Sequence, residues 1–291
     1  MKKSFRYLAV TLTLVSVLAA TIGCVARGAE PLPPKERLRL ATTTSLYDTG
    51  LWEYLEPIFE KEYSVELDIL YAGTGIALEY GRRGDVDVIT VHSRSHEEEF
   101  IAEGYGVERV PFAYNYFLIV GPASDPIGIK GMVPEDAFRR LADAETAAFI
   151  SRGDDSGTHG KEKAVWESAG YDYEAVRSAG QWYIEAGRGM GPTLLMANEK
   201  RGYTLTDVGT FLAYKGKIDL VPVVDKDSIL LNVYSVIACN PEENPSVDYE
   251  AANNLVRFLT SPEIQELIGN YGAREYGMSL FTPCAEAEPQ S

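Results

Sequence analysis

The sequence predicts an α/β protein with two lobes and a cleft between them, and three observations support this fold class. Segments with the alternating pattern of strands are interleaved with segments of helical spacing along most of the chain. Two β-rich stretches, 114–120 and 234–239, each run into a proline-containing turn and frame a second strand–helix series. The length of 291 residues also exceeds the ~100–150 residues usual for one domain.

The first strand–helix series lies before residue 114. Residues 38–41 are predicted to form a strand, and the apolar positions of 46–63 fall at helical spacing. The same patterns predict strands at 65–71 and 86–91 and helices at 76–82 and 97–103. Because strands and helices alternate, we expect parallel strands joined by right-handed crossovers.

The second series lies between the two β-rich stretches. Its predicted segments are a helix at 134–148, a strand at 148–151, helices at 158–169 and 192–200, and a strand at 219–224. Helices at 249–259 and 262–270 follow, the latter opened by Ser261-Pro262. The first predicted lobe is therefore 37–117 plus 236–285, the second is 118–235, and 286–291 form a tail.

The N-terminus has the pattern of an export signal. Lys2, Lys3 and Arg6 precede an apolar run at 8–22, and Gly23-Cys24 follows at once. We interpret residues 1–24 as a signal peptide ending in a lipobox, with Cys24 lipidated; a plain cleaved signal and an uncleaved anchor are the alternatives. Residues 25–36 are rich in proline and are predicted to be a tether. The expected location is the periplasm or the outer face of the cytoplasmic membrane.

Composition excludes several classes of partner. Charged residues make up 24 % and hydrophobic residues 45 % of the chain, as in a folded protein. The formal net charge of −16 repels nucleic acid and anionic lipid headgroups. A monomer that contacts the membrane only through its lipid or N-terminal anchor is expected.

After Cys24 only Cys239 and Cys284 remain, so a disulfide between them is one candidate and two isolated thiols are the other.

Two hydroxyl-rich segments each follow a strand and precede a helix. The first is Thr42-Thr43-Thr44-Ser45, where helix N–H groups and hydroxyls can form a cup for an anion; ordinary capping is the alternative. The second, 151–160, adds a guanidinium; its candidate ligand residues are Arg152, Ser156, Gly157 and Thr158. Its alternative is a surface loop in which Arg152 pairs with Asp154 or Asp155.

Other polar segments carry weaker signals. Gly73-Thr74-Gly75 also precedes a helix and could add a donor to the site or be a plain turn. The glycine-rich 187–193 precedes another helix and could line the cleft or act as a flexible segment. Nucleotide-binding glycine motifs and hydrolase motifs are absent from the sequence. We interpret the three histidines, His92, His96 and His159, as solvated or hydrogen-bonded side chains. No catalytic residue, metal ligand or cofactor is predicted.

An ordered set of segments resembles the tungstate-binding proteins of TupA-type ABC importers. The set is Thr42 to Ser45, Val91-His92-Ser93, 99–107, 114–122, Ser151 to His159 and 203–207. The resemblance implies a two-lobed periplasmic-binding fold of type II, each lobe a mixed, mainly parallel sheet flanked by helices, with two crossing hinge strands. It implies that Thr43, Thr44 and Ser45 hold the anion from one lobe and Arg152, Ser156, Gly157 and Thr158 from the other. Thr74 and Ser93 would complete the shell.

The implied ligand sets a condition on the site. Tungstate is fully deprotonated at neutral pH and only accepts hydrogen bonds, so Asp154 and Asp155 are expected to point away from it; a carboxylate facing the ligand would favour phosphate. Molybdate, phosphate and sulfate remain alternatives within the same class. An exported phosphoryl-handling enzyme and a structural surface lipoprotein are the alternatives from other classes. The expected partner is the membrane permease of an ABC importer.

Overall fold

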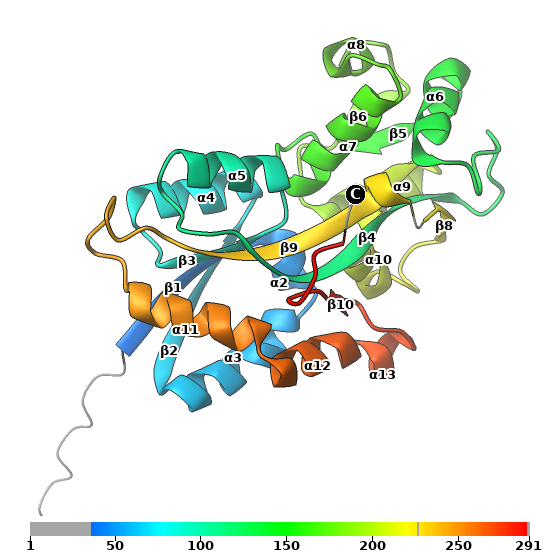
Figure 1. Ribbon diagram of the computed structural model, residues 1–291. Coiled ribbons are helices and arrows are strands. Elements are labelled where there is room, and N and C mark those ends of the chain that lie inside the picture. The colour runs from blue at the N-terminus through cyan, green and yellow to red at the C-terminus, as the bar shows by residue number, and fades with distance from the viewer. Residues whose placement is uncertain (1–35, 226, 290–291) are drawn as a thin grey trace, which may run out of the picture. The chain divides into compact units, whose positions relative to one another are not determined.

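The computed structural model describes residues 36–225 and 227–289 (Figure 1). The predicted signal peptide, the predicted lipidation site Cys24 and nearly all of the tether lie outside the described residues. Within the described ranges, no helix is long and apolar enough to cross a membrane.

The first strand–helix series forms as the sequence predicts, with one break. Strand β1 (Glu36–Thr43) pairs in parallel with β2 (Val65–Ala72) and β3 (Val88–Val91), and helices α4 (Thr74–Arg83) and α5 (Arg94–Ala102) follow β2 and β3. The prediction of one helix over 46–63 is wrong in extent. It is two helices, α2 (Thr44–Asp48) and α3 (Leu51–Tyr63), because Gly50 between them adopts φ 76°, a left-handed conformation that ends a helix.

The two β-rich stretches form the long strands β4 (Val110–Pro122) and β9 (Leu231–Ala238), which run side by side (Figure 1). They pair antiparallel, and each also pairs with other strands at one end. Strand β9 joins β3, while the second half of β4 joins β7 (Thr204–Asp207) and β8 (Leu220–Val224). The two strands therefore connect the first strand series to the second in one mixed, curled sheet.

The second series lies between β4 and β9 in sequence. Its further elements are α6 (Pro134–Ala144), β5 (Phe149–Ser151), α7 (Gly157–Ser168), α8 (Tyr173–Arg177), β6 (Tyr183–Glu185), α9 (Met190–Lys200), α10 (Val208–Ala213) and the 3-10 helix η1 (Ser228–Leu230). Strand β5 pairs in parallel with β6. The elements that the sequence did not predict, α8, β6 and α10 among them, are six residues or fewer, too short to show a periodic pattern.

The C-terminal segment returns to the first series. Helices α11 (Tyr249–Thr260) and α12 (Pro262–Asn270) begin where predicted, and α13 (Ala273–Tyr276) and β10 (Thr282–Pro283) follow. Strand β10 pairs with β4 at the edge of the sheet. Apolar side chains of α3, α11 and α12 share one core cluster with those of β1, and side chains of α6 and α7 pack in another cluster with those of β5 and β7.

The candidate disulfide does not form. Cys239 and Cys284 are both buried free thiols. Cys239 forms a backbone bridge with Gly106, whereas Cys284 donates its backbone N–H to the carbonyl of Phe112, so the two cysteines contact different parts of the chain.

Candidate functional site

A small cavity lies where four strand–helix junctions meet, and we call it the binding cavity. Its volume is about 10 Å³, close to the space of a single water molecule. The residues lining it are Thr43, Thr44, Ser45, Ala72, Gly73, Thr74, His92, Arg152, Ser156 and Gly157. The structure thus brings the threonine cluster, the arginine segment and Thr74 together around one space.

The N-termini of α2, α4 and α7 all open onto the binding cavity. Thr43 Oγ1 caps α2 by accepting from the N–H of Leu46 at 3.3 Å, and Ser156 Oγ caps α7 by accepting from the N–H of His159 at 3.3 Å. Helix α4 has Gly73 at its N-cap and no side-chain cap. Capping therefore uses one hydroxyl each at α2 and α7, and the first-turn N–H groups of α4 stay available to an anion.

Within the threonine cluster, the hydroxyl of Thr42 makes hydrogen bonds inside the protein, whereas other members line the binding cavity. Thr42 Oγ1 accepts from Trp52 Nε1 at 3.1 Å and from Thr90 Oγ1 at 2.8 Å, so it ties β1 to α3 and β3. Thr44 and Ser45 line the cavity instead, and Thr74 Oγ1 is buried without a hydrogen-bond partner among the described residues. A buried hydroxyl in that state costs free energy until an acceptor is bound.

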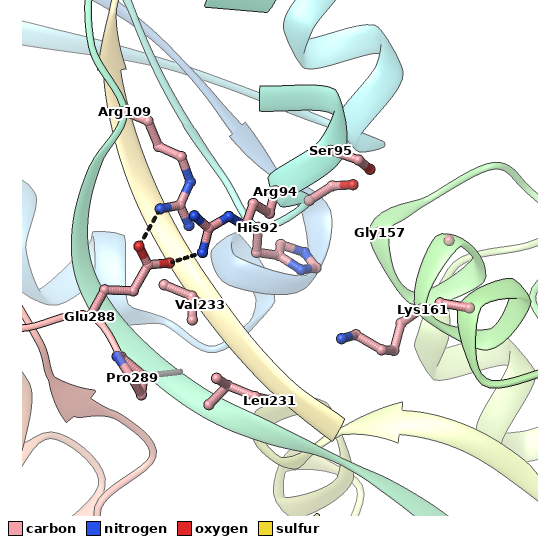
Figure 2. A pocket seen from close by; sticks show the side chains of 13 residues that line it. His92, Arg94, Ser95, Arg109, Gly157, Lys161, Leu231, Val233, Glu288 and Pro289 are labelled. Atoms are coloured by element: carbon pink, nitrogen blue, oxygen red, sulfur yellow. Dashed lines mark hydrogen bonds and ion pairs between the residues drawn. The ribbon is translucent and has the colours of Figure 1, made fainter. Parts of the chain in front are cut away.

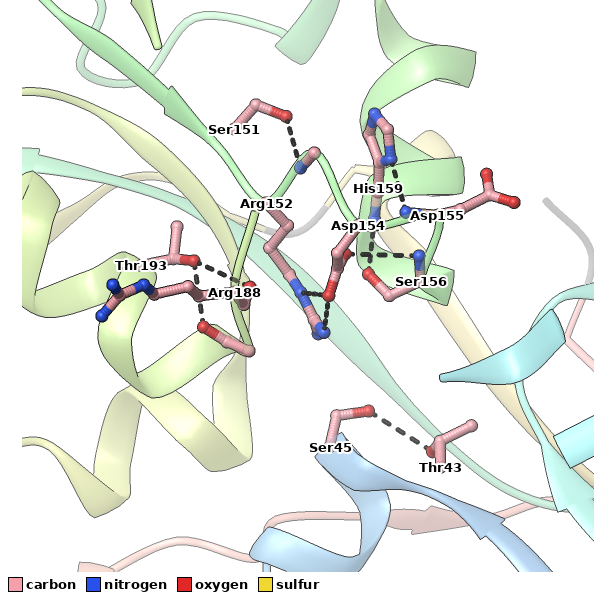
Figure 3. A network of polar contacts seen from close by, with 12 residues as sticks. Thr43, Ser45, Ser151, Arg152, Asp154, Asp155, Ser156, His159, Arg188 and Thr193 are labelled. Atoms are coloured by element: carbon pink, nitrogen blue, oxygen red, sulfur yellow. Dashed lines mark hydrogen bonds and ion pairs between the residues drawn. The ribbon is translucent and has the colours of Figure 1, made fainter. Parts of the chain in front are cut away.

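Arg152 is the cation of the binding cavity. Figure 3 shows its guanidinium pointing toward Ser45 from the segment after β5. The Nε atom donates to Asp154 Oδ2 at 3.1 Å and Nη2 donates to the same oxygen, while Nη1 donates no hydrogen bond to residues 36–225 or 227–289. Asp154 Oδ1 accepts from the Ser156 N–H at 3.3 Å, so Asp154 holds Arg152 and the start of α7 in place.

Neither acidic residue of this segment lines the cavity. Asp155 is 81 % exposed at its side chain and pairs with Lys163 at 3.1 Å, which lowers the pKa of the Asp155 carboxyl. The alternative was a surface loop in which Arg152 pairs with a neighbouring aspartate. Arg152 does pair with Asp154, but it is buried and also lines the cavity. Among the described residues the lining contains hydrogen-bond donors and no carboxylate.

Comparison with known proteins adds family membership to this geometry. Residues 29–263 match the model of the PBP superfamily domain. The tungstate-binding protein TupA of Peptoclostridium acidaminophilum is 42 % identical over 96 % of this chain and 99 % of its own, and that of Campylobacter jejuni is 40 % identical over 77 % and 83 %. The structure of the tungstate-binding protein TupA from Desulfovibrio alaskensis superposes with a TM-score of 0.76 at 41 % identity, covering 86 % of this chain and all of that one.

The chain belongs to the TupA-type family of the PBP superfamily. As a TupA-type chain it is a binding protein and not an enzyme. The α/β periplasmic-binding fold predicted from the sequence is confirmed by the same comparisons, and most of its strands form one mixed, curled sheet flanked by helices.

His92 is the lining residue that the sequence analysis missed in this TupA-type chain. It follows β3, and its ring is buried, with Nε2 3.0 Å from Ser45 Oγ. Burial lowers the pKa of His92 to about 4, so the ring is neutral at physiological pH. A Cβ atom on Gly157 would lie 2.7 Å from this ring, so only glycine lets α7 approach it. Its position after a strand, like that of the threonine cluster, was the available signal.

Two of the proposed ligand residues lie beside the binding cavity. Thr158 does not line it, although its Oγ1 atom is buried without a hydrogen-bond partner in the described part of the chain. Ser93 lines a neighbouring, larger cavity, where its Oγ atom lies 2.7 Å from His96 Nδ1. The glycine-rich 187–193 lies outside the lining; there the hydroxyl of Thr193 bonds to the carbonyl of Gly189 at 3.0 Å.

Proposed function

We propose that this protein is the extracytoplasmic binding protein of an ABC importer, that it captures tungstate in the binding cavity, and that it delivers the anion to the membrane permease. One observation carries the proposal: three helix N-termini and one guanidinium converge on a cavity whose described lining has no carboxylate. Tungstate is the ligand in the names of the TupA relatives.

Donors from both predicted lobes would hold the anion. Thr43, Thr44 and Ser45 act from the end of β1, and Thr74 with the free N–H groups of α4 acts beside them. Arg152, Ser156 and the N–H of Gly157 act from the other side, with Thr158 turning its unpaired hydroxyl inward as the cavity expands. Each charge-assisted hydrogen bond contributes about 1.5–3 kcal/mol net, so a few give tight capture.

The protonation of the cavity fits an anion without a proton. Asp154 is turned to Arg152 and Asp155 to Lys163, so neither offers an acceptor to the ligand. The neutral ring of His92 can hold its proton on Nε2 and donate to Ser45, which leaves the Ser45 hydroxyl free to donate to the anion. Hydrogen phosphate would favour the opposite arrangement, in which His92 accepts and a Ser45 lone pair faces the ligand.

The small volume has a mechanical consequence. About 10 Å³ is too little for a tetrahedral anion, so the walls of the cavity must first move apart to admit the ligand. We propose that the predicted lobes, 37–117 plus 236–285 and 118–235, move about β4 and β9 and close on the anion because it bonds to both. The closed form then docks on the permease.

We also propose where the protein acts and how it is anchored. Membership of the PBP superfamily supports an exported protein. We propose a monomer held at the outer face of the cytoplasmic membrane through lipidated Cys24, with no cofactor other than its anion ligand.

Titration calorimetry of the purified protein with tungstate, molybdate, phosphate and sulfate tests the ligand. We expect tight binding of tungstate at one site per chain, with phosphate and sulfate far weaker. Tight binding of phosphate without a response to tungstate would contradict the ligand assignment and favour the arrangement in which His92 accepts. Turnover of a phosphoryl ester by the purified protein would instead favour the exported enzyme.

A further inference from the structure

A second cavity lies beside the binding cavity, and we call it the basic cavity. Its volume is about 200 Å³, and it shares the walls formed by His92 and Gly157 with the binding cavity. It lies between the start of α5, one face of α7, strand β9 and the C-terminal segment (Figure 2). Two hydroxyls, of Ser93 and Ser95, and the side chains of three cations line it.

The side chains that line the basic cavity carry a net positive charge, opposite in sign to that of the whole chain, although Arg94 and Arg109 also pair with Glu98 and Glu97 outside the lining. Arg94, Arg109 and Lys161 line it, and Glu288 is the one carboxylate in its described lining. The chain as a whole carries a formal net charge of −16. A local cluster of cations in a recess of an acidic protein concentrates small anions there.

Lys161 brings an uncompensated charge from the α7 side. Its Nζ atom donates to the carbonyl of Ile229 at 2.9 Å, and no carboxylate of the described residues lies within ion-pair distance. Burial lowers the pKa of Lys161, which means that the surroundings do not neutralise its charge. An anion in the basic cavity would supply the missing partner.

Arg109 brings a donor without an acceptor. Its side chain is only 9 % exposed; Nε donates to Glu97 Oε2 at 2.6 Å and Nη1 donates to Glu288 Oε2 at 2.8 Å. The Nη2 atom is buried and has no hydrogen-bond partner among the residues that the structure describes. A buried guanidinium N–H in that state is destabilising, so the guanidinium of Arg109 retains unused capacity to donate to an oxyanion.

Glu288 occupies the position that an anion would take. Figure 2 shows its carboxylate between the two arginines, with Oε2 bonded to Arg109 and Oε1 3.6 Å from Arg94 Nη1. A carboxylate offers arginine the same pair of acceptor oxygens as a small oxyanion does. The protein's own C-terminal segment thus shows that the basic cavity accepts an anionic group.

We infer that the basic cavity is a second anion-binding site, for a small doubly charged oxyanion, and that Glu288 is its built-in competitor. The inference rests on the proposed function only for the identity of the anion. The ligand would lie between the guanidinium of Arg109, Lys161 and Arg94 after displacing the Glu288 carboxylate. Because His92 and Gly157 wall both cavities, an anion held there waits next to the binding cavity.

Calorimetry of the full chain with tungstate, and separately with sulfate, tests this inference through E288Q. Removing the competing carboxylate should strengthen binding at the second site by roughly 10- to 150-fold, from the range of one charge-assisted hydrogen bond. We expect a second binding event in E288Q, about one further anion per chain. Adding K161Q to E288Q should weaken that event by about tenfold and leave the first event unchanged. E286Q removes an equal charge two residues away, on an exposed side chain outside the basic cavity, and is the matched control.

The outcomes separate the two claims. If E288Q, E286Q and the wild type show the same stoichiometry and affinity, the second site is refuted. If E288Q gains an event that K161Q does not weaken, the anion binds elsewhere and the inference is also wrong. If tight tungstate binding is missing in every variant but E288Q gains a sulfate event sensitive to K161Q, the proposed function fails and the second site stands.

Discussion

Replacing Arg152 by alanine should weaken tungstate binding by roughly 10- to 150-fold. Arg152 is 5 % exposed, lines the binding cavity, and has Nη1 free of hydrogen bonds in the part of the chain that the structure describes. A hydrogen bond from a charged donor contributes about 1.5–3 kcal/mol net. Since 1.4 kcal/mol is a factor of ten in affinity, loss of this donor alone gives the stated range.

The alanine variant also exposes a negative charge to the ligand. Asp154 would keep only the Ser156 N–H at 3.3 Å as a partner, and its carboxylate would then repel a dianion. Adding Asp154→Asn to the alanine variant should therefore recover part of the lost affinity. Arg152→Lys keeps the charge without the planar fork of donors, and its affinity should lie between those of the wild type and the alanine variant.

The assay is calorimetry at constant ionic strength, with the unfolding temperature of each ligand-free variant measured beside it. Arg188→Ala is the matched control, because it removes the same charge from an exposed side chain that points away from Arg152 (Figure 3). If the folded Arg152→Ala variant binds tungstate as the wild type does, Arg152 is not a ligand residue. An equal loss in Arg188→Ala would show that only the overall charge matters.

Three further predictions follow from buried groups. Gly157→Ala should weaken tungstate binding by about tenfold or more, while the unfolding temperature changes little. The added Cβ would lie 2.7 Å from the His92 ring and hold the two walls of the binding cavity apart. Unchanged affinity would show that the close approach of Gly157 to His92 is not needed. Burial raises the pKa of Glu162 to about 7, so the protonated form is favoured in the folded state, and stability is lost as pH rises from about 4.5 to 7. Measured by urea unfolding, the stability of Glu162→Gln relative to the wild type should rise by up to about 3 kcal/mol over that interval, and a pH-independent difference would contradict the shift. Burial also raises the pKa of Cys239 and of Cys284 to about 12, so neither thiol should react with a thiol reagent until the protein unfolds, and fast labelling of the native state would refute their burial.

Long elements were predictable because their patterns repeat over several turns. Helix α12 (Pro262–Asn270) has the predicted bounds, since Ser261 caps it and Pro262 fixes its first residue. The break at Gly50 was missed because apolar residues keep helical spacing on both sides of it. Short elements such as α10 carry no periodic signal and are held by packing and by the cap that Asp207 gives to Thr210.

The candidate site was predictable in its chemistry and less so in its membership. Hydroxyls and a guanidinium at two strand ends indicated an oxyanion, and the structure brings these segments to one cavity. His92 was not predicted as a lining residue because a single histidine after a strand is only a weak signal. Its place in the lining also depends on the close approach of Gly157. Ser93, one residue further, faces the basic cavity instead.

The sequence by itself determined the strand–helix alternation, the export signal as an expectation, and the kinds of donor at each strand end, because these depend on neighbouring residues and on side-chain chemistry. The tertiary structure alone decided which donors share a cavity, that Asp154 turns to Arg152, and that Cys239 and Cys284 stay apart. The shared cavity joins segments distant in sequence, which no local pattern encodes. Arg152 and Asp154 are only two residues apart, but the sequence left open whether Asp154 or Asp155 is the partner.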